Sequence, residues 1–497
     1  MESTDLKKIE NELTERLAYL KKDELDKVKK ALLFSKKVHK NAKRLSGEPY
    51  ITHPLKTALR LADLKLDSTS IAAAILHDTV EDTEANYWQI RIQFGKDVAN
   101  LVESVTKLET IRIKKGWFPL VGISSKKLPE FEKQVETLRK MLIAMSKDIR
   151  VILIKLADKI HNLETLEYLP KESRERIARE VIEIYAPIAH RLGMGQWKGY
   201  LEDLAFPYIL PEEYKNLRKL AIPEMKEREE YLKTFVAKTK RLLGQNKIKA
   251  KIDFRAKRWY SLYKKLKKYE GDLSKIYDLT AIRIIVDNIE DCYSILGLIH
   301  SVWRPLVGRI KDYIALPKPN GYRSIHTTVF ADGGQIVEIQ IRTNEMHIQG
   351  EYGVAAHWVY SENKFSRQPN AREFKWLQDF RKIQKTVSSA DELIRSFKLD
   401  LFEDRIFVFT PDGDVRDLPQ GATPVDFAYS IHSDIGNHCA MAKVNNKITS
   451  IDTKLENGNI VEIVTKKNAR PHRDWLEFVK TQAARNQIRK VIGDRVA

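Results

Sequence analysis

The first 200 residues alternate between apolar stretches with a helical period and short polar turns. Examples of the apolar stretches are LDSTSIAAAILHDTV and KDIRVILIKLADKIHNLETL. This pattern predicts an all-α domain over residues 1–200, followed by a charged helical connector over residues 201–250. One segment of the helical part, residues 111–127, contains GWFPLVG and is predicted to form a loop between helices.

From Ile276 onward the hydrophobic period changes to two. Three segments either alternate apolar and polar residues or contain consecutive β-branched residues: YDLTAIRIIVD, YRSIHTTVF and QIVEIQIRT. Gly, Pro and Asn lie between them. Helical patterns flank these strands, which predicts an α+β domain with a mixed sheet over residues 251–360. A basic helical linker is expected over residues 361–400.

The last part of the chain carries shorter strand patterns. RIFVFTPDGDVRDLP, AMAKVNNKITSI and NIVEIVTKK surround a helix expected from Pro424 to about Ile431. They predict a small β-grasp module over residues 401–467, and residues 468–497 are expected to begin another helical domain. The expected fold class is therefore multidomain, with an all-α domain, an α+β domain with a mixed sheet, and a β-grasp domain.

The composition fits a globular protein of several domains. A chain of 497 residues is too long for one core, and its 43% hydrophobic and 31% charged residues exclude general disorder. It has no run of about 18 apolar residues and no secretory signal at its start, so a cytoplasmic protein without membrane contact is expected. The two cysteines, Cys292 and Cys439, lie far apart, which excludes a disulfide framework.

The formal net charge of +19 indicates a polyanionic partner. Residues 233–268 contain fourteen lysines and arginines against one acidic residue, Asp253. One interpretation is a solvated helix face. Another is a surface that binds RNA without catalysis, whose main property would be salt-dependent binding. A third is a substrate site for a phosphorylated ligand.

Four residues of the helical part have the chemistry of a metal site: His53 in YITHP, the adjacent His77 and Asp78, and Asp158 in KLADKIHNL. Borderline divalent metals bind imidazole and carboxylate ligands. These ligand types alone do not identify the metal, because they permit iron and zinc. The His-Asp pair follows the apolar stretch IAAAIL, so we expect it to be buried beside the core. An uncompensated polar group is costly there.

Helical spacing adds further polar residues to this region. Glu81 and Asp82 follow one turn after the His-Asp pair, where a carboxylate could order or deprotonate a water molecule. Asp158, Asn162 and Thr165 share one face of a second helix at positions i, i+4 and i+7.

Three segments, KRLSGEPYITHP, ILHDTVEDT and VILIKLADKIHNLETL, together resemble the hydrolase domain of the RelA/SpoT homologue family, within the wider HD phosphohydrolases. The resemblance implies removal of the 3′-pyrophosphate from (p)ppGpp. It implies that Mn²⁺ is bound by His53, His77, Asp78 and Asp158, that Glu81 and Asp82 assist the attacking water, and that guanosine is held by Arg44, Asn162 and Thr165. The segment 111–127 departs from the family pattern because it is longer and differently composed.

The sheet domain has no GxxxxGK[ST] motif, which excludes a P-loop, so side chains must hold any phosphates. In RAKRWYSLYKKL, cations surround an apolar stripe of Trp259, Leu262 and Leu266, which is interpreted equally well as core. In QIVEIQIRT, Glu338, Gln340 and a following arginine lie on one strand face, opposite the apolar positions. Asp278 opens another strand, so the domain offers two carboxylates, Asp278 and Glu338, amid many cations. This combination suits phosphoryl-type transfer.

These segments, with GRIKDYIALPKPNGYRSIHTTV, resemble the synthetase domain of the same family. The resemblance implies that ATP donates pyrophosphate to the 3′-OH of GDP or GTP. It implies that Asp278 and Glu338 bind Mg²⁺ and that Glu338 is the general base. It implies that Tyr322 stacks on the acceptor guanine near Lys318, Asn320 and His326. It implies that ATP is gripped by Arg255, Lys257, Lys265, Arg283 and Lys311. Gln340 and Arg342 complete the expected substrate-binding set.

The form Arg309-Ile310-Lys311-Asp312 is similar to the basic R-x-K-D sequence of bifunctional family members. A hydrolase with a weak synthetase is the alternative within the family, and the retained Asp278 and Glu338 argue against it.

The β-grasp module resembles a TGS domain. The resemblance implies contact with deacylated tRNA on the ribosome through His432, for which a helix-cap role is the alternative. It also implies regulatory domains beyond residue 497, so either an engineered truncation or a shortened natural form is expected.

Overall fold

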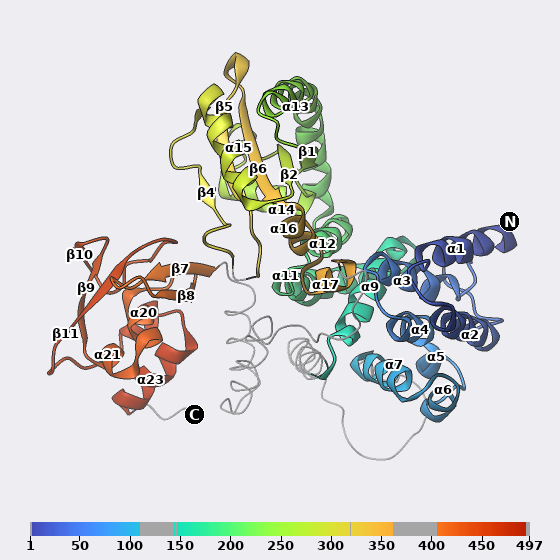
Figure 1. The fold of residues 1–497 in the computed structure, drawn as a ribbon. Helices are drawn as coiled ribbons and strands as arrows, with labels where there is room; N and C mark the ends of the chain where they lie inside the picture. Colours follow the sequence, from blue (N-terminus) through green and yellow to red (C-terminus); the bar gives the residue numbers. More distant parts are fainter. Residues whose placement is uncertain (1, 110–143, 145–146, 319, 361–404, 494–497) are drawn as a thin grey trace. The chain divides into compact units, whose positions relative to one another are not determined.

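The structure is a computed structural model that describes residues 2–109, 144, 147–318, 320–360 and 405–493 (Figure 1). The chain forms two compact units, Met1–Gln378 and Asp379–Ala497. The loop predicted at 111–127 and the linker predicted at 361–400 lie outside the described residues.

Helices make up the first part of unit one, which confirms the predicted all-α domain. The first helices are α1 (Glu2–Arg16), α2 (Lys22–Val38), α3 (Thr52–Asp63), α4 (Ser68–Leu76), α5 (Thr79–Asp82), α6 (Tyr87–Phe94) and α7 (Lys96–Glu109). They are followed by α9 (Arg150–Glu164), η1 (Leu166–Tyr168), α10 (Lys171–Glu180), the π-helical η2 (Val181–Tyr185), α11 (Ala186–Arg191) and α12 (Gly195–Ile209). Helix α9 is buried on almost every side, and its buried residues include the polar Lys155, Asp158, Lys159 and His161.

The helical pattern is interrupted at the His-Asp pair. Helix α4 begins with a cap in which the Asp67 carboxylate accepts the Ser70 N–H, and every residue of its IAAAIL stretch is buried. The helix ends at Leu76, and α5 starts at Thr79. The carbonyl of Asp78 accepts the N–H of Asp82 at 2.9 Å, so the polar residues follow in a tight turn. The sequence pattern did not predict this break.

The charged connector is the 35-residue helix α13 (Pro211–Gln245), which contains Pro223 in its interior. Helix α12 precedes it and packs both on helices of the all-α domain, such as α9 and α10, and on the sheet-domain helices α14 and α16. In the described part of the chain, no helix combines the length and the apolar character needed to cross a bilayer.

The sheet domain follows α13 and confirms the predicted mixed sheet. Its strands run in the order β1-β2-β6-β5-β3, with β4 paired to β5. Strands β2 and β6 are parallel, and the other pairs are antiparallel. The strands are β1 (Lys251–Ala256), β2 (Thr280–Val286), β3 (Arg304–Pro305), β4 (Lys311–Asp312), β5 (Ile325–Phe330) and β6 (Ile336–Thr343). The helices are α14 (Trp259–Lys268), η3 (Leu273–Lys275), α15 (Ile289–Val302), η4 (Asp332–Gly334), α16 (Asn344–Tyr352), η5 (Gly353–Ala355) and α17 (Ala356–Tyr360).

The two faces of this sheet differ in chemistry. One face carries the apolar residues of β2, β5 and β6, which form a buried core with residues of α13 and α15. The other face is polar, because side chains alternate along a strand. The register places Arg283 beside Gln340 and Gln340 beside His326, so neighbouring strands bring their polar side chains together.

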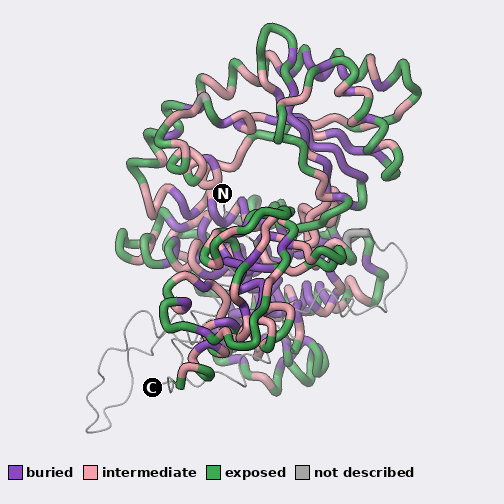
Figure 2. Tube along the Cα trace, turned by 90° about the vertical axis from the view of Figure 1, so that its left-hand side faces the viewer, coloured by how far each residue is buried: buried purple, intermediate pink, exposed green. Residues whose placement is uncertain are grey.

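The second unit has the strands and helix predicted for a β-grasp module. Its elements are β7 (Arg405–Phe409), β8 (Val415–Pro419), α20 (Pro424–Ile431), α21 (Ser433–Asn437), β9 (Cys439–Val444), β10 (Lys447–Thr449), β11 (Val461–Thr465), α22 (Trp475–Phe478) and α23 (Gln482–Ile492). The fully buried Asp426 of α20 accepts the backbone N–H groups of Lys480 and Thr481, which fixes the start of α23. Figure 2 colours the chain trace by burial and shows buried and exposed residues alternating along the helices and strands.

Candidate functional site

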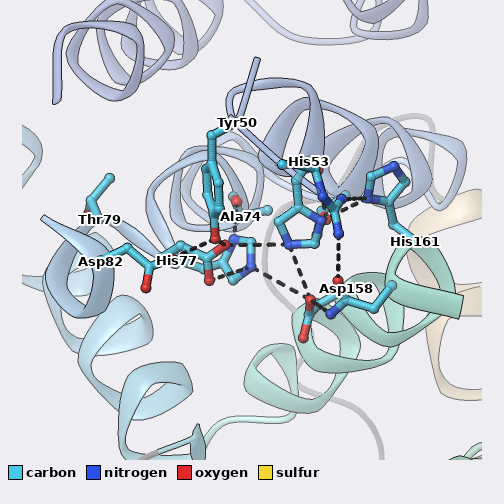
Figure 3. A network of polar contacts seen from close by, with 12 residues as sticks. Tyr50, His53, Ala74, His77, Thr79, Asp82, Asp158 and His161 are labelled. Carbon is cyan, nitrogen blue, oxygen red and sulfur yellow. Dashed lines mark hydrogen bonds and ion pairs between the residues drawn. The ribbon is translucent and has the colours of Figure 1, made fainter. Parts of the chain in front are cut away.

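Three of the predicted metal ligands meet inside the helical domain. Ligand atoms of His53 from α3, His77 from the end of α4, and Asp158 from α9 all lie within 4.8 Å of one another, and all three residues are buried. Figure 3 shows the two imidazoles and the carboxylate pointing toward one another. Asp78 lies against both imidazoles, with its carboxylate oxygens 3.0 Å from His77 Nε2 and 3.4 Å from His53 Nε2.

The orientation of His77 fits a metal ligand. Its Nδ1 lies 2.7 Å from the carbonyl oxygen of Ala74, so Nδ1–H donates to the backbone. Its Nε2 is buried without a hydrogen-bond partner of good geometry among the described residues. Ligating histidines usually donate the second ring N–H to a carbonyl or carboxylate, which fixes the tautomer. The donor set therefore fits a divalent cation.

The electrostatics of the cluster keep its two carboxylates, Asp78 and Asp158, in the ionised form that binds a cation. Burial alone would raise the pKa of Asp158, but Lys155, His53 and His77 hold this pKa well below its usual range. Burial likewise opposes ionisation of Asp78, whereas His77 and then His53 lower its pKa. Burial would lower the pKa of His77, but Asp78 and Asp158 raise it.

Two residues that the sequence reasoning missed support this cluster. His161 Nδ1 lies 2.7 Å from His53 Nδ1 and 2.8 Å from Arg44 Nη1 (Figure 3). Burial, then His53 and Arg44, lower the pKa of His161 to about 2, so its Nδ1 accepts both contacts as a neutral imidazole. Lys155 is fully buried and donates to Asp158 Oδ2 at 2.9 Å. Lys155 and His161 lie three residues before and after Asp158, and this helical spacing was the signal in the sequence that they lie near Asp158.

Tyr50 is a third missed residue. Its hydroxyl lies 2.8 Å from Asp78 Oδ2 and 2.6 Å from Asp82 Oδ2, so one phenol is shared by two carboxylates. Asp82 is thereby held beside the metal cluster, as its predicted role requires. Glu81 lies on the same short helix and is exposed.

The predicted guanosine-binding residues lie beside the cluster. Arg44 Nη2 donates to Asn162 Oδ1 at 3.1 Å, and Asn162 Nδ2 donates to Asp158 Oδ1 at 2.6 Å. Thr165 ends α9, and its hydroxyl donates to the carbonyl of His161 at 3.2 Å. The structure therefore links Arg44 and Asn162 directly to the cluster and places Thr165 one turn away.

A second polar cluster lies in the sheet domain around Asp278. The ammonium groups of Lys257 and Lys265 both pair with Asp278 Oδ2. Burial would raise the pKa of Asp278, but the two lysines lower it. Burial, despite the attraction of Asp278, lowers the pKa of Lys257 to about 8. The apolar stripe of α14 packs in the core, with Leu262 fully buried. The motif thus serves both core and site.

Glu338 lies at the same end of the parallel β2–β6 pair as Asp278, because Glu338 is opposite Ala281 in the register. Its carboxylate is 3.6 Å from His326 Nδ1, and His326 Nε2 lies 2.9 Å from the Tyr322 hydroxyl. Burial and nearby cations, Lys318 first, lower the pKa of His326 to about 3. His326 therefore lies between Tyr322 and Glu338, and its lowered pKa favours the neutral imidazole.

Other predicted synthetase residues line the polar sheet face. Arg255 Nη1 donates to Gln340 Oε1 at 2.9 Å, and Arg283 Nη1 donates to Glu351 Oε1 at 2.9 Å. Arg342 is fully buried rather than displayed to solvent, and its Nη2 lies 3.5 Å from Glu351. Glu351 of α16 was missed by the sequence reasoning, because only the tertiary fold brings it to these arginines.

The remaining predicted residues lie at the edge of this face. Lys311 pairs in register with His326, and the Lys318 ammonium lies 5.4 Å from the centroid of the Tyr322 ring. The Asn320 side chain accepts the Tyr322 N–H at 3.2 Å, and Gly321 has φ +79°, which favours glycine in this turn. The ring of Tyr322 is half-buried.

Several cations of the basic stretch 233–268 pair with acidic residues of unit one. Two of its cations pair with Asp278, as described above. Others pair with acidic residues elsewhere in unit one: Lys264 with Glu202, Lys238 with Asp332, and Arg258 with Asp203. This distribution disfavours a single RNA-binding face along the stretch.

In the second unit, His432 precedes α21, and its Nδ1 accepts the Asp434 N–H at 3.2 Å. The helix-cap contact considered from the sequence is therefore present. His432 is exposed, so a ligand could still contact its other ring nitrogen.

Three family models match the chain. Residues 31–195 match the HD domain, residues 254–365 match a region found in RelA / SpoT proteins, and residues 406–465 match the TGS domain. Asp203, on α12, lies between the first two matched segments.

Several curated proteins are similar along almost the whole chain. A GTP pyrophosphokinase of Myxococcus xanthus is 46% identical over 94% of this chain and 60% of that protein. A guanosine-3′,5′-bis(diphosphate) 3′-pyrophosphohydrolase of Aquifex aeolicus is 44% identical over 94% of this chain and 64% of its own length. The bifunctional (p)ppGpp synthase/hydrolase SpoT of Escherichia coli is 42% identical over 95% of this chain and 66% of that protein. The chain spans less than two thirds of the length of these relatives.

Proposed function

Because this chain belongs to the RelA/SpoT family, we propose that it both hydrolyses and synthesises (p)ppGpp, at two separate sites. The observation that carries the proposal is the presence of two polar clusters in one unit: the buried His53, His77 and Asp158 set, and the Asp278 and Glu338 end of the sheet.

In the hydrolase half, His53, His77, Asp78 and Asp158 would hold Mn²⁺. A divalent cation bound by these four residues would lower the pKa of the attacking water. Asp82, fixed beside Asp78 by Tyr50, takes a proton from this water, and Glu81 assists. The planar Arg44, held by Asn162 and His161, stacks on the guanine. Thr165, at the end of α9, is assigned to binding the same nucleoside. The water oxygen bonds to the phosphorus attached to the 3′-oxygen as the bond between them breaks; pyrophosphate leaves and the 3′-oxygen receives a proton.

In the synthetase half, Asp278 and Glu338 would hold Mg²⁺, whose charge offsets that of the ATP phosphates. Glu338 takes the proton of the acceptor 3′-OH as this oxygen bonds to the β-phosphorus and AMP leaves. Gln340 Nε2 donates to Glu338 Oε1 at 3.1 Å and orients this carboxylate, and His326 lies beside it, with its Nδ1 3.6 Å away. Cations stabilise the transferred phosphates. We assign this gripping role to Arg255, Lys257, Lys265, Arg283 and Lys311.

The acceptor guanine is assigned to Tyr322, with Lys318 and Asn320 beside it. Gln340 orients Arg255, and Arg342 supports the site from within the core. In the second unit, we assign to His432 the contact with the 3′ end of deacylated tRNA on the ribosome, and the TGS match supports this role.

A direct assay tests the proposed function. The protein is incubated either with ATP, GDP and Mg²⁺ or with ppGpp and Mn²⁺, and the nucleotides are resolved by chromatography. We expect ppGpp and AMP from the first mixture and GDP and pyrophosphate from the second. A protein that only binds RNA would produce neither pair. Apo protein supplied with Mg²⁺ alone distinguishes the metal requirement of each reaction.

Replacing Tyr50 with Phe is expected to slow ppGpp hydrolysis by about 10–100-fold, as for other residues that orient metal ligands. The variant loses the hydroxyl shared by Asp78 and Asp82 and keeps the ring. The initial rate of pyrophosphate release measures the effect. Tyr19→Phe is the matched control, because its hydroxyl donates to the Leu66 carbonyl in the same domain. Equal rates in Tyr50→Phe and wild type would remove Tyr50 from the mechanism.

The synthetase is expected to lose activity toward ATP at alkaline pH. The pKa of Lys257 is lowered to about 8, so its cation is present below that pH and is lost as the pH rises through it. Because kcat/KM reports the free enzyme, kcat/KM for ATP should fall by up to about tenfold per pH unit above 8. Lys257→Arg keeps a charge at all these pH values and should remove the decline. An unchanged decline in Lys257→Arg would assign the titration to another group.

A further inference from the structure

Helix α14 has no cap from its own sequence. The residue before it, Arg258, makes no side-chain hydrogen bond to the first turn. Instead, Asp203 of helix α12 accepts the N–H of Tyr260 with its Oδ1 at 3.1 Å. Tyr260 is the second residue of α14, and an N-cap side chain normally accepts from the second or third residue. The cap is thus supplied by a helix that lies 57 residues earlier in the chain.

Further contacts hold the start of α14 against α12. Arg258 Nη1 lies 3.7 Å from Asp203 Oδ2, and Lys264 donates to the buried Glu202 at 3.0 Å. At Gly199 a Cβ atom would lie only 3.1 Å from the Arg258 side chain, so the glycine makes room for it. Residues 199, 202 and 203 share one face of α12 by their spacing.

The same segment supplies both ammonium groups that meet Asp278. Lys257 directly precedes Arg258, and its backbone N–H donates to the Leu279 carbonyl at 3.0 Å. Lys265 lies further along α14, and its Nζ is 2.5 Å from Asp278 Oδ2. An uncapped first turn leaves its N–H groups without partners and frays. Fraying of α14 would loosen the turn that follows Lys257 and change the direction in which Lys265 projects.

We infer that Asp203 is a positioning residue of the synthetase: by capping α14 from helix α12 it holds Lys257 and Lys265 in the geometry that receives the ATP phosphates. This inference rests on the proposed synthetase function. Asp203 contacts neither the proposed general base nor the acceptor residues in the described part of the chain. Its effect is therefore confined to ATP.

The helix docking itself does not depend on Asp203. The Phe206 ring of α12 lies 5.4 Å from the ring of Tyr260 and 5.2 Å from that of Tyr263, within a shared apolar core. We therefore expect Asp203→Ala to fold, with only the first turn of α14 loosened.

The test uses the full chain with three variants. In Asp203→Ala we expect KM for ATP to rise about tenfold, the size of effect expected for loss of a helix cap, while KM for GDP and the rate of ppGpp hydrolysis stay within about twofold of wild type. Asp203→Asn keeps an acceptor oxygen and should restore KM for ATP, since Asn caps helices as well as Asp. Calorimetric titration with α,β-methylene-ATP and Mg²⁺ should show the same loss and the same rescue.

Asn288→Ala is the matched control. Asn288 caps α15 of the same domain by accepting the Asp291 N–H at 2.8 Å, and α15 carries no proposed ATP contact. Unchanged KM and affinity for ATP in Asp203→Ala would overturn the inference, as would an equal increase in Asn288→Ala or a failure of Asn to rescue. Absence of synthesis by the wild type would instead contradict the proposed function, and the analogue titration would still test the positioning of the lysines.

Discussion

Replacing Glu338 with Gln is expected to reduce (p)ppGpp synthesis by about 1,000-fold or more, with hydrolysis within about twofold of wild type. The glutamine has the same shape and can still accept from Gln340 Nε2, which lies 3.1 Å from Glu338 Oε1. It cannot take the proton of the acceptor 3′-OH, and it is a weaker ligand for Mg²⁺. The loss should therefore appear in kcat, measured as AMP formation from saturating ATP and GDP.

Glu345→Gln provides the control for this prediction. Glu345 is an exposed carboxylate on α16, just beyond β6, so its replacement makes the same chemical change outside the cluster. Synthesis by Glu338→Gln above about a tenth of the wild-type rate would exclude Glu338 as the general base.

Replacing Asp158 with Asn is expected to reduce hydrolysis by about 1,000-fold or more and to abolish tight Mn²⁺ binding, while synthesis with Mg²⁺ continues. Asp158 is the carboxylate of the buried three-residue cluster and also contacts His53 Nε2 at 3.2 Å. The neutral amide keeps an acceptor for Lys155 and removes the negative charge that a cation needs. Electron paramagnetic resonance of free Mn²⁺ measures binding, and pyrophosphate release measures hydrolysis.

Two further variants make this result interpretable. Asp148→Asn alters an acidic residue that pairs with Arg150 just before α9, outside the cluster, and should retain both properties. Asp78→Ala should lose hydrolysis as Asp158→Asn does, without disturbing Lys155. If Asp158→Asn and Asp78→Ala both bind Mn²⁺ as wild type does, the metal site lies elsewhere.

Local patterns were enough to predict much of the fold and part of both sites. The alternation in QIVEIQIRT correctly separated the apolar core side of β6 from the side that carries Glu338 and Gln340. The helical spacing of Asp158 and Asn162 placed them on one face, where the structure joins them by a hydrogen bond. Both results depend only on the periodicity of an element, which is contained in a few consecutive residues.

Residues that act through distant contacts could not be found in this way. Tyr50 meets Asp82 across 32 residues of sequence, and Asp203 caps a helix across 57 residues. No local pattern records such a contact. The break between α4 and α5 was also missed, because an apolar run followed by acidic residues fits one continuous helix equally well.

The most direct test of two separate sites mixes equal amounts of Glu338→Gln and Asp158→Asn protein with excess ATP, limiting GDP, Mg²⁺ and Mn²⁺, and measures AMP formed per GDP supplied. Asp158→Asn alone should stop near one AMP per GDP, because ppGpp accumulates, and Glu338→Gln alone should form almost none. The mixture should far exceed one AMP per GDP, since one protein regenerates the GDP that the other consumes. A mixture that stops at one AMP per GDP, or forms none, would contradict the account.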